Sequence, residues 1–305
     1  MKRILDCSSS DFEKMSKKDI LEAIEASEGR VLVSEMIGIL QPILVNISNA
    51  ELSTAFGSDI LLLNMFDLDD PVFHGIPSVP KDDIPKEIKK LTGRLLGVNL
   101  EPVDESAETI GEILSIPDGR KASVKNAEKA IDMGFNMIVL TGNPGTGVSN
   151  KEITSSLKAI SSKFKDKIIL TAGKMHAAGS LKESGENIIT KDDIKEFVSS
   201  GADIILLPAP GTVPGITLEY VKKLVTYSHS LGALTMTSIG TSQEGSDEDT
   251  IKRIALMCKM AGTDLHHIGD AGYPGMAIPE NIMVYSIVIR GKRHTYTRMA
   301  RSINR

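Results

Sequence analysis

Hydrophobic runs alternate with amphipathic stretches along this chain, and four of the runs share one leading pattern. Each starts with a glycine, a variable residue and Asp or Asn: GSDILLLN (57–64), GFNMIVLT (134–141), GADIILLP (201–208) and GTDLHHIG (262–269). A glycine at this place is typical of a helix C-terminus, and an unbroken apolar run is typical of a strand buried on both faces. The pattern predicts four strands of a parallel sheet, each directly after a helix.

Four more apolar runs complete the series, at 30–38, 94–100, 167–173 and 232–238. The amphipathic segments predict helices at 49–56, 84–92, 123–133, 150–164, 190–200, 216–231, 247–261 and 279–302. Eight strand–helix alternations favour one (β/α)8 TIM barrel domain spanning 1–305. The segment 15–29 predicts an extra helix that covers the bottom of the barrel, within an N-terminal helical extension (1–29). The alternative is a doubly wound open sheet, but the first strand is not followed by that fold's glycine fingerprint.

Composition narrows the function classes. The net charge of −5 and the pI near 5.8 argue against a nucleic-acid binder, and the absence of Trp argues against a base-stacking surface. No apolar run approaches the roughly 20 residues of a membrane helix, and the first residues lack the apolar core of a signal peptide, so we expect a cytoplasmic protein without membrane partners. Two cysteines are too few for a disulfide framework, and Cys258 is expected to be a small buried residue.

In a TIM barrel the reactive groups lie at the C-terminal ends of the strands. The polar residues at these ends are Glu35, Asn64, Asp67, Asn99, Glu101, Asn143, Lys174, His176, Thr237, Ser238, His267 and Asp270. Lys174 and His176 lie two residues apart among small residues. They can act as a cationic anchor or Schiff-base amine and a general acid or base. The alternative is a solvated lysine and a histidine that caps a helix.

Glu35 and Glu101 follow apolar strand residues, where an unpaired carboxylate is costly to bury. Each therefore needs a cation, a metal or a substrate, and a structural ion pair is the alternative to catalysis. Consecutive residues of a strand point to opposite faces. Because His267 shares parity with Asn64, we expect it, rather than His266, to face the pocket, either as a catalytic residue or as a hydrogen-bonded core histidine.

Two kinds of ligand site are also predicted. Asp67, Glu101 and Asp270, with His176, offer ligands for Mg²⁺ or Mn²⁺, and Asp67 is a catalytic candidate too. Anion-binding candidates lie in glycine-rich loops after strands 4, 7 and 8, where backbone N–H groups can turn toward a phosphate. They are Asn143, Gly145, Thr146, Gly240, Thr241, Gly269 and Gly272. Glycine turns without a ligand are the alternative, because nearby acidic residues repel phosphate.

One segment carries a family resemblance. NAELSTAFGSDILLLN (49–64) resembles the phosphoenolpyruvate mutase and isocitrate lyase superfamily, in which an Asn-Ala-x-Ser-Ala helix leads into Gly-Phe-Asp and a strand. The resemblance covers about one strand–helix unit and implies Mg²⁺-dependent chemistry on C–C or C–P bonds next to a carboxylate. The superfamily's Lys-x-Cys-Gly lid does not occur here. The whole chain also resembles a group of bacterial TIM barrels labelled phosphonomutase-like.

These observations predict a lyase or isomerase that acts on a small anionic metabolite, such as a phosphorylated sugar or a keto acid. Lys174 would bind or polarise the substrate, and His176 or Glu101 would move a proton. The alternative is a non-catalytic barrel that binds a metabolite or an assembly partner. A homo-oligomer is expected because the last helix is apolar at 280–289, and the basic segment 288–305 is expected to be a solvated or subunit-contacting face.

Overall fold

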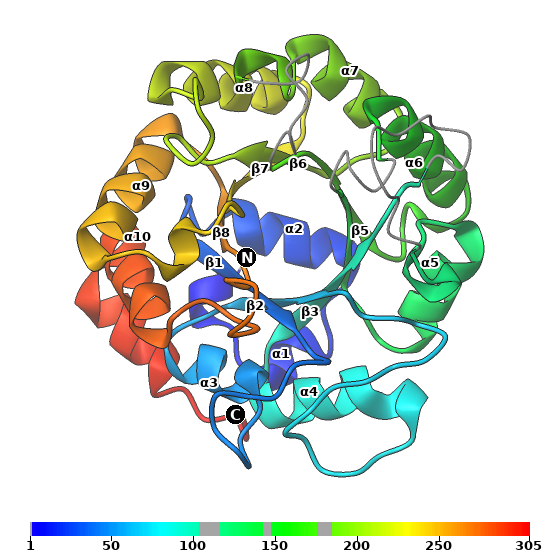
Figure 1. The fold of residues 1–305 in the computed structure, drawn as a ribbon, viewed down its shortest axis with the longest axis vertical. Helices are drawn as coiled ribbons and strands as arrows, with labels where there is room; N and C mark the ends of the chain where they lie inside the picture. The colour runs from blue at the N-terminus through cyan, green and yellow to red at the C-terminus, as the bar shows by residue number, and fades with distance from the viewer. Residues whose placement is uncertain (1, 104–115, 143–147, 176–184) are drawn as a thin grey trace.

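The computed structural model describes residues 2–103, 116–142, 148–175 and 185–305. Eight parallel strands close into a barrel in the order of the sequence, and helices surround it (Figure 1). The strands are β1 (Val31–Ile37), β2 (Ile60–Asn64), β3 (Leu95–Leu100), β4 (Met137–Leu140), β5 (Ile169–Gly173), β6 (Ile204–Pro208), β7 (Leu234–Ile239) and β8 (Leu265–Ile268). The predicted (β/α)8 fold is confirmed.

The helices follow the predicted segments closely. The outer ring consists of α3 (Asn49–Ala55), α4 (Ile84–Thr92), α5 (Val124–Asp132), α6 (Asn150–Phe164), α7 (Lys191–Ser199), α8 (Leu218–Ser230), α9 (Glu248–Ala261) and α10 (Pro279–Met299). Short 3₁₀ turns are η2 (Lys81–Asp83), η3 (Asp118–Arg120), η6 (Gly185–Asn187) and η7 (Gln243–Gly245). Ser and Thr side chains cap several of these helices, as Ser48 does for α3 and Thr190 for α7. The ends of the helices were therefore readable from local sequence.

The repeated Gly-x-Asp/Asn pattern forms a joint at the amino-terminal end of the barrel. In each repeat the Asp or Asn donates its backbone N–H to the carbonyl of one residue on the preceding strand. Its side-chain oxygen accepts the backbone N–H of that strand residue. The four pairs are Asp59 with Leu32, Asn136 with Leu96, Asp203 with Leu170 and Asp264 with Thr235, with side-chain bonds of 2.8, 3.2, 2.7 and 2.8 Å. The motif thus fixes pairs of strands, and the even-numbered strands begin about three residues later than the pattern predicts.

Cationic side chains neutralise the acidic members of this joint. Asp203 pairs with Lys17 at 2.7 Å, and Asp264 accepts from Nε2 of His229 at 2.7 Å. Asp59 has the most buried partners, because its carboxylate contacts the guanidinium groups of Arg290 and Arg298 and all three side chains are fully buried. The basic segment 288–305 was expected to be a solvated or subunit-contacting face, and for these two arginines, which are buried within the chain, that prediction is wrong.

We expect the His229–Asp264 pair to add stability only at lower pH. The hydrogen bond to Asp264 raises the pKa of His229 above its usual 6.5. The contribution is therefore fully present below pH 6.5 and is lost as the pH rises through the folded-state pKa. His229→Gln should lower the free energy of unfolding by up to about 1 kcal/mol at pH 5.5, because the pair is partly exposed, and by less at pH 8.5. Urea unfolding at both pH values measures this; an equal loss at both would contradict it.

The N-terminal segment lies across the amino-terminal opening of the barrel. It contains η1 (Ile4–Asp6), α1 (Ser9–Phe12) and α2 (Lys17–Glu25), and Figure 1 shows α2 inside the outline of the strand ring. Ile20 and Ile24 of α2 belong to the same buried cluster as the interior residues Val31 and Leu95. The helix expected at 15–29 therefore does cover the bottom of the barrel.

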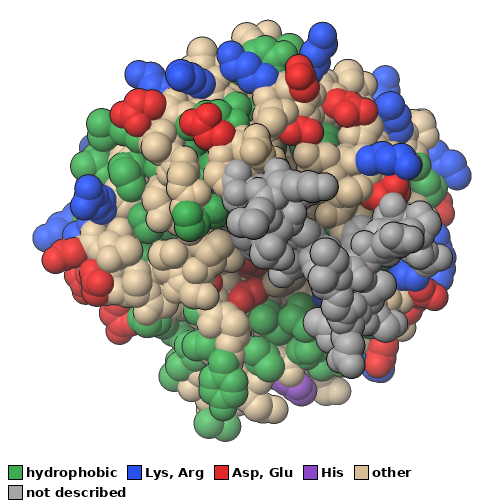
Figure 2. Space-filling view, turned by 45° about the horizontal axis from the view of Figure 1, so that its top comes forward, with side chains coloured by type: hydrophobic (Ala, Val, Ile, Leu, Met, Phe, Trp, Pro, Cys, Tyr) green, Lys and Arg blue, Asp and Glu red, His purple; other side chains and the backbone are tan. Residues whose placement is uncertain are grey.

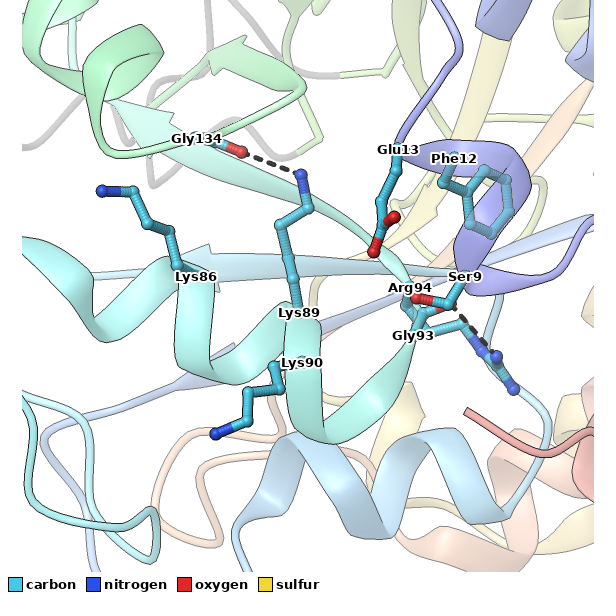
Figure 3. A pocket seen from close by; sticks show the side chains of 9 residues that line it. All are labelled: Ser9, Phe12, Glu13, Lys86, Lys89, Lys90, Gly93, Arg94 and Gly134. Atoms are coloured by element: carbon cyan, nitrogen blue, oxygen red, sulfur yellow. Dashed lines mark hydrogen bonds between the residues drawn. The ribbon is translucent and has the colours of Figure 1, made fainter. Parts of the chain in front are cut away.

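A hollow of about 290 Å³ lies where this segment meets α4. In Figure 3, Lys89 donates to the Gly134 carbonyl, at 3.1 Å, and Glu13 reaches into the same space. The guanidinium of Arg94 donates instead to the backbone carbonyls of Ser58, Gly93 and Arg298. Because a carboxylate shares the hollow and the arginine's donors are used, we assign this basic pocket a structural role.

The last helix buries much of its apolar face within the chain. Its apolar residues Ile282, Tyr285 and Ile289 are fully buried. These residues of the stretch 280–289 pack against the barrel, and the expected oligomer contact of this helix stays a prediction. Cys258 on α9 is also fully buried, and burial raises its pKa to about 11, in line with a packing role. A search of the described helices for one long and apolar enough to cross a membrane found none.

Candidate active site

Alternate residues of the strands point into the barrel, and on five strands the last inward position at the C-terminal end is polar. Below them the interior is filled by apolar residues such as Val33, Leu62 and Met236. Continuing this alternation by two residues gives Glu35 on β1, Asn64 on β2, Asn99 on β3, Ser238 on β7 and His267 on β8. The barrel therefore forms a layer of polar side chains above a dry core.

Four of these side chains form a buried chain of contacts. Ser238 Oγ lies 2.7 Å from His267 Nδ1, and His267 Nε2 lies 3.5 Å from Glu35 Oε2. Asn99 Nδ2 donates to Glu35 Oε1 at 2.5 Å. Ser238 and His267 are fully buried, and Glu35 and Asn99 are nearly so. Two groups able to move a proton are thus held next to each other, each oriented by a neutral partner.

His266 lies on the other side of β8. Its Nδ1 is 3.2 Å from the Tyr285 hydroxyl and its Nε2 is 3.0 Å from the Gly29 carbonyl. Burial lowers the pKa of His266 to about 4, so it is neutral near pH 7. The parity argument therefore gives the correct orientation for both histidines, while the catalytic role of His267 stays a prediction.

A second series of side-chain contacts leads from Asn99 through Asn64 to Asp270. Asn99 Nδ2 also lies 3.2 Å from Asn64 Oδ1, and Asn64 Nδ2 donates to Asp270 Oδ2 at 2.7 Å. Burial raises the pKa of Asp270, and the negative charge of Glu35 raises it further. Burial likewise raises the pKa of Glu244, which precedes α9 and is 4% exposed. Burial therefore makes the charged form of both carboxyl groups less favourable than it is in water.

Several buried polar atoms in this layer lack a hydrogen-bond partner among the described residues. They are Asn99 Oδ1, His267 Nε2, Glu244 Oε2, Thr141 Oγ1 and Thr171 Oγ1. Buried polar groups are normally paired, and an unpaired one costs about 1–3 kcal/mol. Polar atoms gathered in this way at the end of a barrel are suited to a polar ligand with several donors and acceptors.

Lys174 directly follows the C-terminal end of β5, the end of the barrel at which the polar layer lies. Its side chain is almost completely buried, at 1% exposure, and it follows Gly173 directly. A Cβ at Gly173 would lie 2.0 Å from the backbone carbonyl oxygen of Leu206 on β6. Only glycine lets β5 and β6 approach this closely, so Gly173 sets the position from which Lys174 extends.

We expect Gly173→Ala to destabilise the barrel and displace Lys174. The contact is with backbone, which has little freedom to move, and overpacking of this kind costs about 1–3 kcal/mol or more. Gly245→Ala is the matched control, because a Cβ there meets nothing within 4 Å. Chemical denaturation of both variants measures the difference. Equal stability of the two variants would show that β5 and β6 separate without cost.

Two predicted acidic candidates have other partners. Glu101 forms an ion pair with Arg120 at the end of β3; burial raises its pKa and Arg120 partly offsets this. Asp67 Oδ1 accepts from the backbone N–H groups of Asp69 and Asp70, which makes a local turn against Gly119. Asp67 therefore has a structural role in this turn, and its catalytic and metal roles stay predictions. In the described parts of the chain, no group of three or more His, Cys, Asp or Glu could hold a metal. Because His176 lies outside those parts, the predicted Mg²⁺ or Mn²⁺ site at Asp67, Glu101 and Asp270 stays a prediction.

The predicted anion-binding loops after β7 and β8 use several of their donors within the chain. Gly269 N–H donates to Ile239 O and Gly272 N–H donates to Asp270 Oδ1, each at 2.8 Å. Thr241 Oγ1 donates to Thr212 O at 2.8 Å, and a Cβ at Gly240 would lie 2.4 Å from Met175 Sδ. The glycines here permit close packing, and anion binding by Gly240, Thr241, Gly269 and Gly272 stays a prediction. His176, Asn143, Gly145 and Thr146 lie outside the described residues.

Sequence reasoning missed how Ser238, Asn64 and Asn99 contribute. All three were noticed as polar residues at strand ends, but no role was assigned to them. The alternation of inward and outward positions that placed His267 in the interior could have identified them. Each of the three residues continues the inward-facing series of its own strand. Glu244 had no such signal, because it comes from a 3₁₀ turn in a loop.

Searches of solved structures find the same fold in distant proteins. A Schiff-base-forming fructose-1,6-bisphosphate aldolase is 14% identical, with 90% of this chain and 99% of that chain covered and a TM-score of 0.57. An archaeal fructose-1,6-bisphosphate aldolase whose catalytic Lys is covalently bound to a carbinolamine intermediate shares the identity and coverage, with a TM-score of 0.58. A thiamine phosphate pyrophosphorylase from Pyrococcus furiosus is 12% identical, with 87% of this chain and 97% of that chain covered and a TM-score of 0.48. At 14% identity the likeness to the two aldolases shows the fold alone.

Comparison by sequence identifies one family. No curated protein matches the chain. None of the findings shows the resemblance to the phosphoenolpyruvate mutase superfamily. A family model described as a domain of unknown function, DUF7916, matches residues 5–305. The chain therefore belongs to the DUF7916 family.

Proposed function

We propose that this protein is a cytoplasmic lyase or isomerase that moves a proton on a small anionic metabolite, such as a phosphorylated sugar or a keto acid. The observation that carries the proposal is the buried series of side-chain contacts from Ser238 through His267 and Glu35 to Asn99 at the C-terminal end of the barrel. General acid–base catalysis needs a proton acceptor fixed within reach of the substrate. Glu35 and His267 supply two such groups in a place where barrel enzymes carry out their chemistry.

The neutral partners assign different tasks to the two groups. Asn99 donates to one carboxylate oxygen of Glu35, which leaves Oε2 directed toward His267 Nε2. Ser238 holds the opposite ring nitrogen. Glu35 and His267 can therefore take a proton from a carbon next to a carbonyl and return it to a neighbouring atom. Positioned acid–base groups of this kind contribute about 10²- to 10⁴-fold to rates.

Lys174 is proposed as the group that binds the substrate's anion or carbonyl. It is a cation held at the end of β5 by the close approach of Gly173 to Leu206. A primary amine can also attack a carbonyl and lose water to give an iminium, which draws electrons from the adjacent C–H or C–C bond. The catalytic lysine of the aldolase of similar fold supports testing this route, although the shared fold alone does not assign it.

The acidic side of the site is compatible with an anionic substrate when its carboxyl groups are protonated. Burial raises the pKa of both Asp270 and Glu244. A neutral carboxyl group donates a hydrogen bond and repels phosphate less than a carboxylate does. We therefore place the anionic group of the substrate toward Lys174 and its hydroxyl or carbonyl groups toward Asp270 and Glu244.

Solvent exchange tests the proposal without knowledge of the product. The protein is incubated in D₂O with a panel of phosphorylated sugars and keto acids, and ¹H NMR follows loss of the signal from the carbon next to the carbonyl. We expect exchange or turnover of at least one compound, and slower exchange in the Lys174→Met variant. Borohydride trapping with mass spectrometry reports an iminium at Lys174. Tight binding of a panel compound with neither exchange nor turnover would contradict the proposal and favour the non-catalytic binding barrel.

A further inference from the structure

Exposed hydrophobic side chains gather on one rim of the barrel. Of the eleven large hydrophobic residues exposed in the described part of the chain, seven lie in two loops, 38–47 after β1 and 271–278 after β8. They are Ile39, Ile43, Leu44, Val45, Ile47, Tyr273 and Ile278, with Val45 at 91% and Tyr273 at 96% exposure. We call these two loops the apolar rim. In Figure 1 the loop after β1 extends past the barrel beside α3, and Figure 2 shows hydrophobic side chains on a projecting lower edge.

The two loops of the apolar rim are held together. Ile37 N–H donates to the Gly275 carbonyl at 2.9 Å, and Met36 forms an antiparallel bridge with Met276. Asn49 contacts both loops, because its Oδ1 accepts from Ile43 N–H at 3.0 Å and its Nδ2 lies 3.5 Å from Pro274 O. The loop 38–47 also closes its own turn through the pairing of Leu44 with Ile47. The surface is thus preformed, which lowers the entropy lost when a partner binds.

The charge distribution around the apolar rim restricts its partner. No charged residue occurs from 36 to 50 or from 271 to 279, and no Lys or Arg occurs from 31 to 80. An anionic membrane is recognised by basic residues beside an apolar surface, so this rim does not suit one. A contact across a two-fold axis places like residues near one another, and a surface without charges avoids self-repulsion. This matters for a chain with a net charge of −5.

We propose that the apolar rim docks onto the same rim of a second copy of this chain to form a two-fold dimer. Contiguous exposed apolar surface of this kind marks interaction sites on proteins. The dimer contact would adjoin the candidate active site, because the two loops extend β1 and β8, which carry Glu35 and His267. The second copy would then border the entrance to the polar layer. The inference does not depend on the proposed catalytic activity.

Sedimentation velocity of the full chain tests the proposal over about 1–100 µM protein. We expect a dimer for the wild type, and a species of half that mass for Val45→Asp and for Tyr273→Asp, with at least a tenfold weaker association. Both side chains are almost fully exposed, so circular dichroism should show unchanged folding. Met260→Asp is the matched control, because Met260 is 57% exposed on α9, outside the apolar rim, and this variant should remain dimeric.

Three results would overturn the proposal. The first is a monomeric wild type over the whole concentration range. The second is a dimer that both rim variants leave unchanged, or that Met260→Asp dissociates equally. The third is cosedimentation of monomeric protein with vesicles of phosphatidylcholine and phosphatidylserine, which would assign the apolar rim to a membrane. If one rim variant fails to fold, the other decides, because they lie in different loops.

Discussion

Replacing Asp59 with asparagine is expected to lower the free energy of unfolding by about 3–5 kcal/mol, the usual cost of removing one partner of a buried ion pair. Asp59 neutralises Arg290 and Arg298, and all three side chains have no exposed surface. Asparagine keeps the shape and can still accept the Leu32 N–H, so the loss comes mainly from the missing charge. Burial lowers the pKa of Arg298, and the Asp59 charge opposes that shift.

Asp69→Asn is the matched control for this prediction. Asp69 contacts Lys125 and Lys129 at 3.4 Å each, but its side chain is 38% exposed. Exposed pairs contribute about 0–1 kcal/mol because water and salt screen them. Urea unfolding followed by circular dichroism compares the two variants with the wild type. A loss for Asp59→Asn as small as that for Asp69→Asn would mean that water or an anion reaches the two arginines.

The fold was predictable because its joints are local and repeated. The Gly-x-Asp/Asn pattern marks each even-numbered strand, and the same residues then clamp the preceding strand. The partners of Asp59 were not predictable. Arg290 and Arg298 lie more than 200 positions away in a basic segment, where charge alone suggests a solvated face. Only the closed barrel, which brings its last helix beside the start of β2, makes them counter-ions.

The site was predictable to the extent that strand parity decides it. Parity places Glu35 and His267 inside the barrel, and the structure brings them to 3.5 Å. Residues in loops follow no such rule. Asp67 is used by its own turn, and the N–H groups of Gly269 and Gly272 are used by neighbouring carbonyl and carboxylate oxygens. Whether a loop donor is available depends on hydrogen bonds that the sequence does not specify.

Glu35→Gln should abolish most of the proposed proton transfer. Glutamine fills the same space and its amide oxygen can still accept from Asn99, but it cannot take up a proton. For any panel compound that exchanges its proton in D₂O, we expect the exchange rate to fall about 10²- to 10⁴-fold. Because the loss concerns the proton transfer itself, kcat should fall while KM changes little.

Glu51→Gln separates this effect from a general loss of structure. Glu51 accepts from the Ser48 N–H and hydroxyl in the capping box of α3, and glutamine serves in such a box as well as glutamate does. This variant should therefore keep both its stability and its exchange rate. If Glu35→Gln retained the rate of Glu51→Gln, Glu35 would be a buried structural carboxylate. His267 would then be the remaining proton acceptor among the four contacting side chains. His267→Asn would in that case have to lower the exchange rate about 10²- to 10⁴-fold.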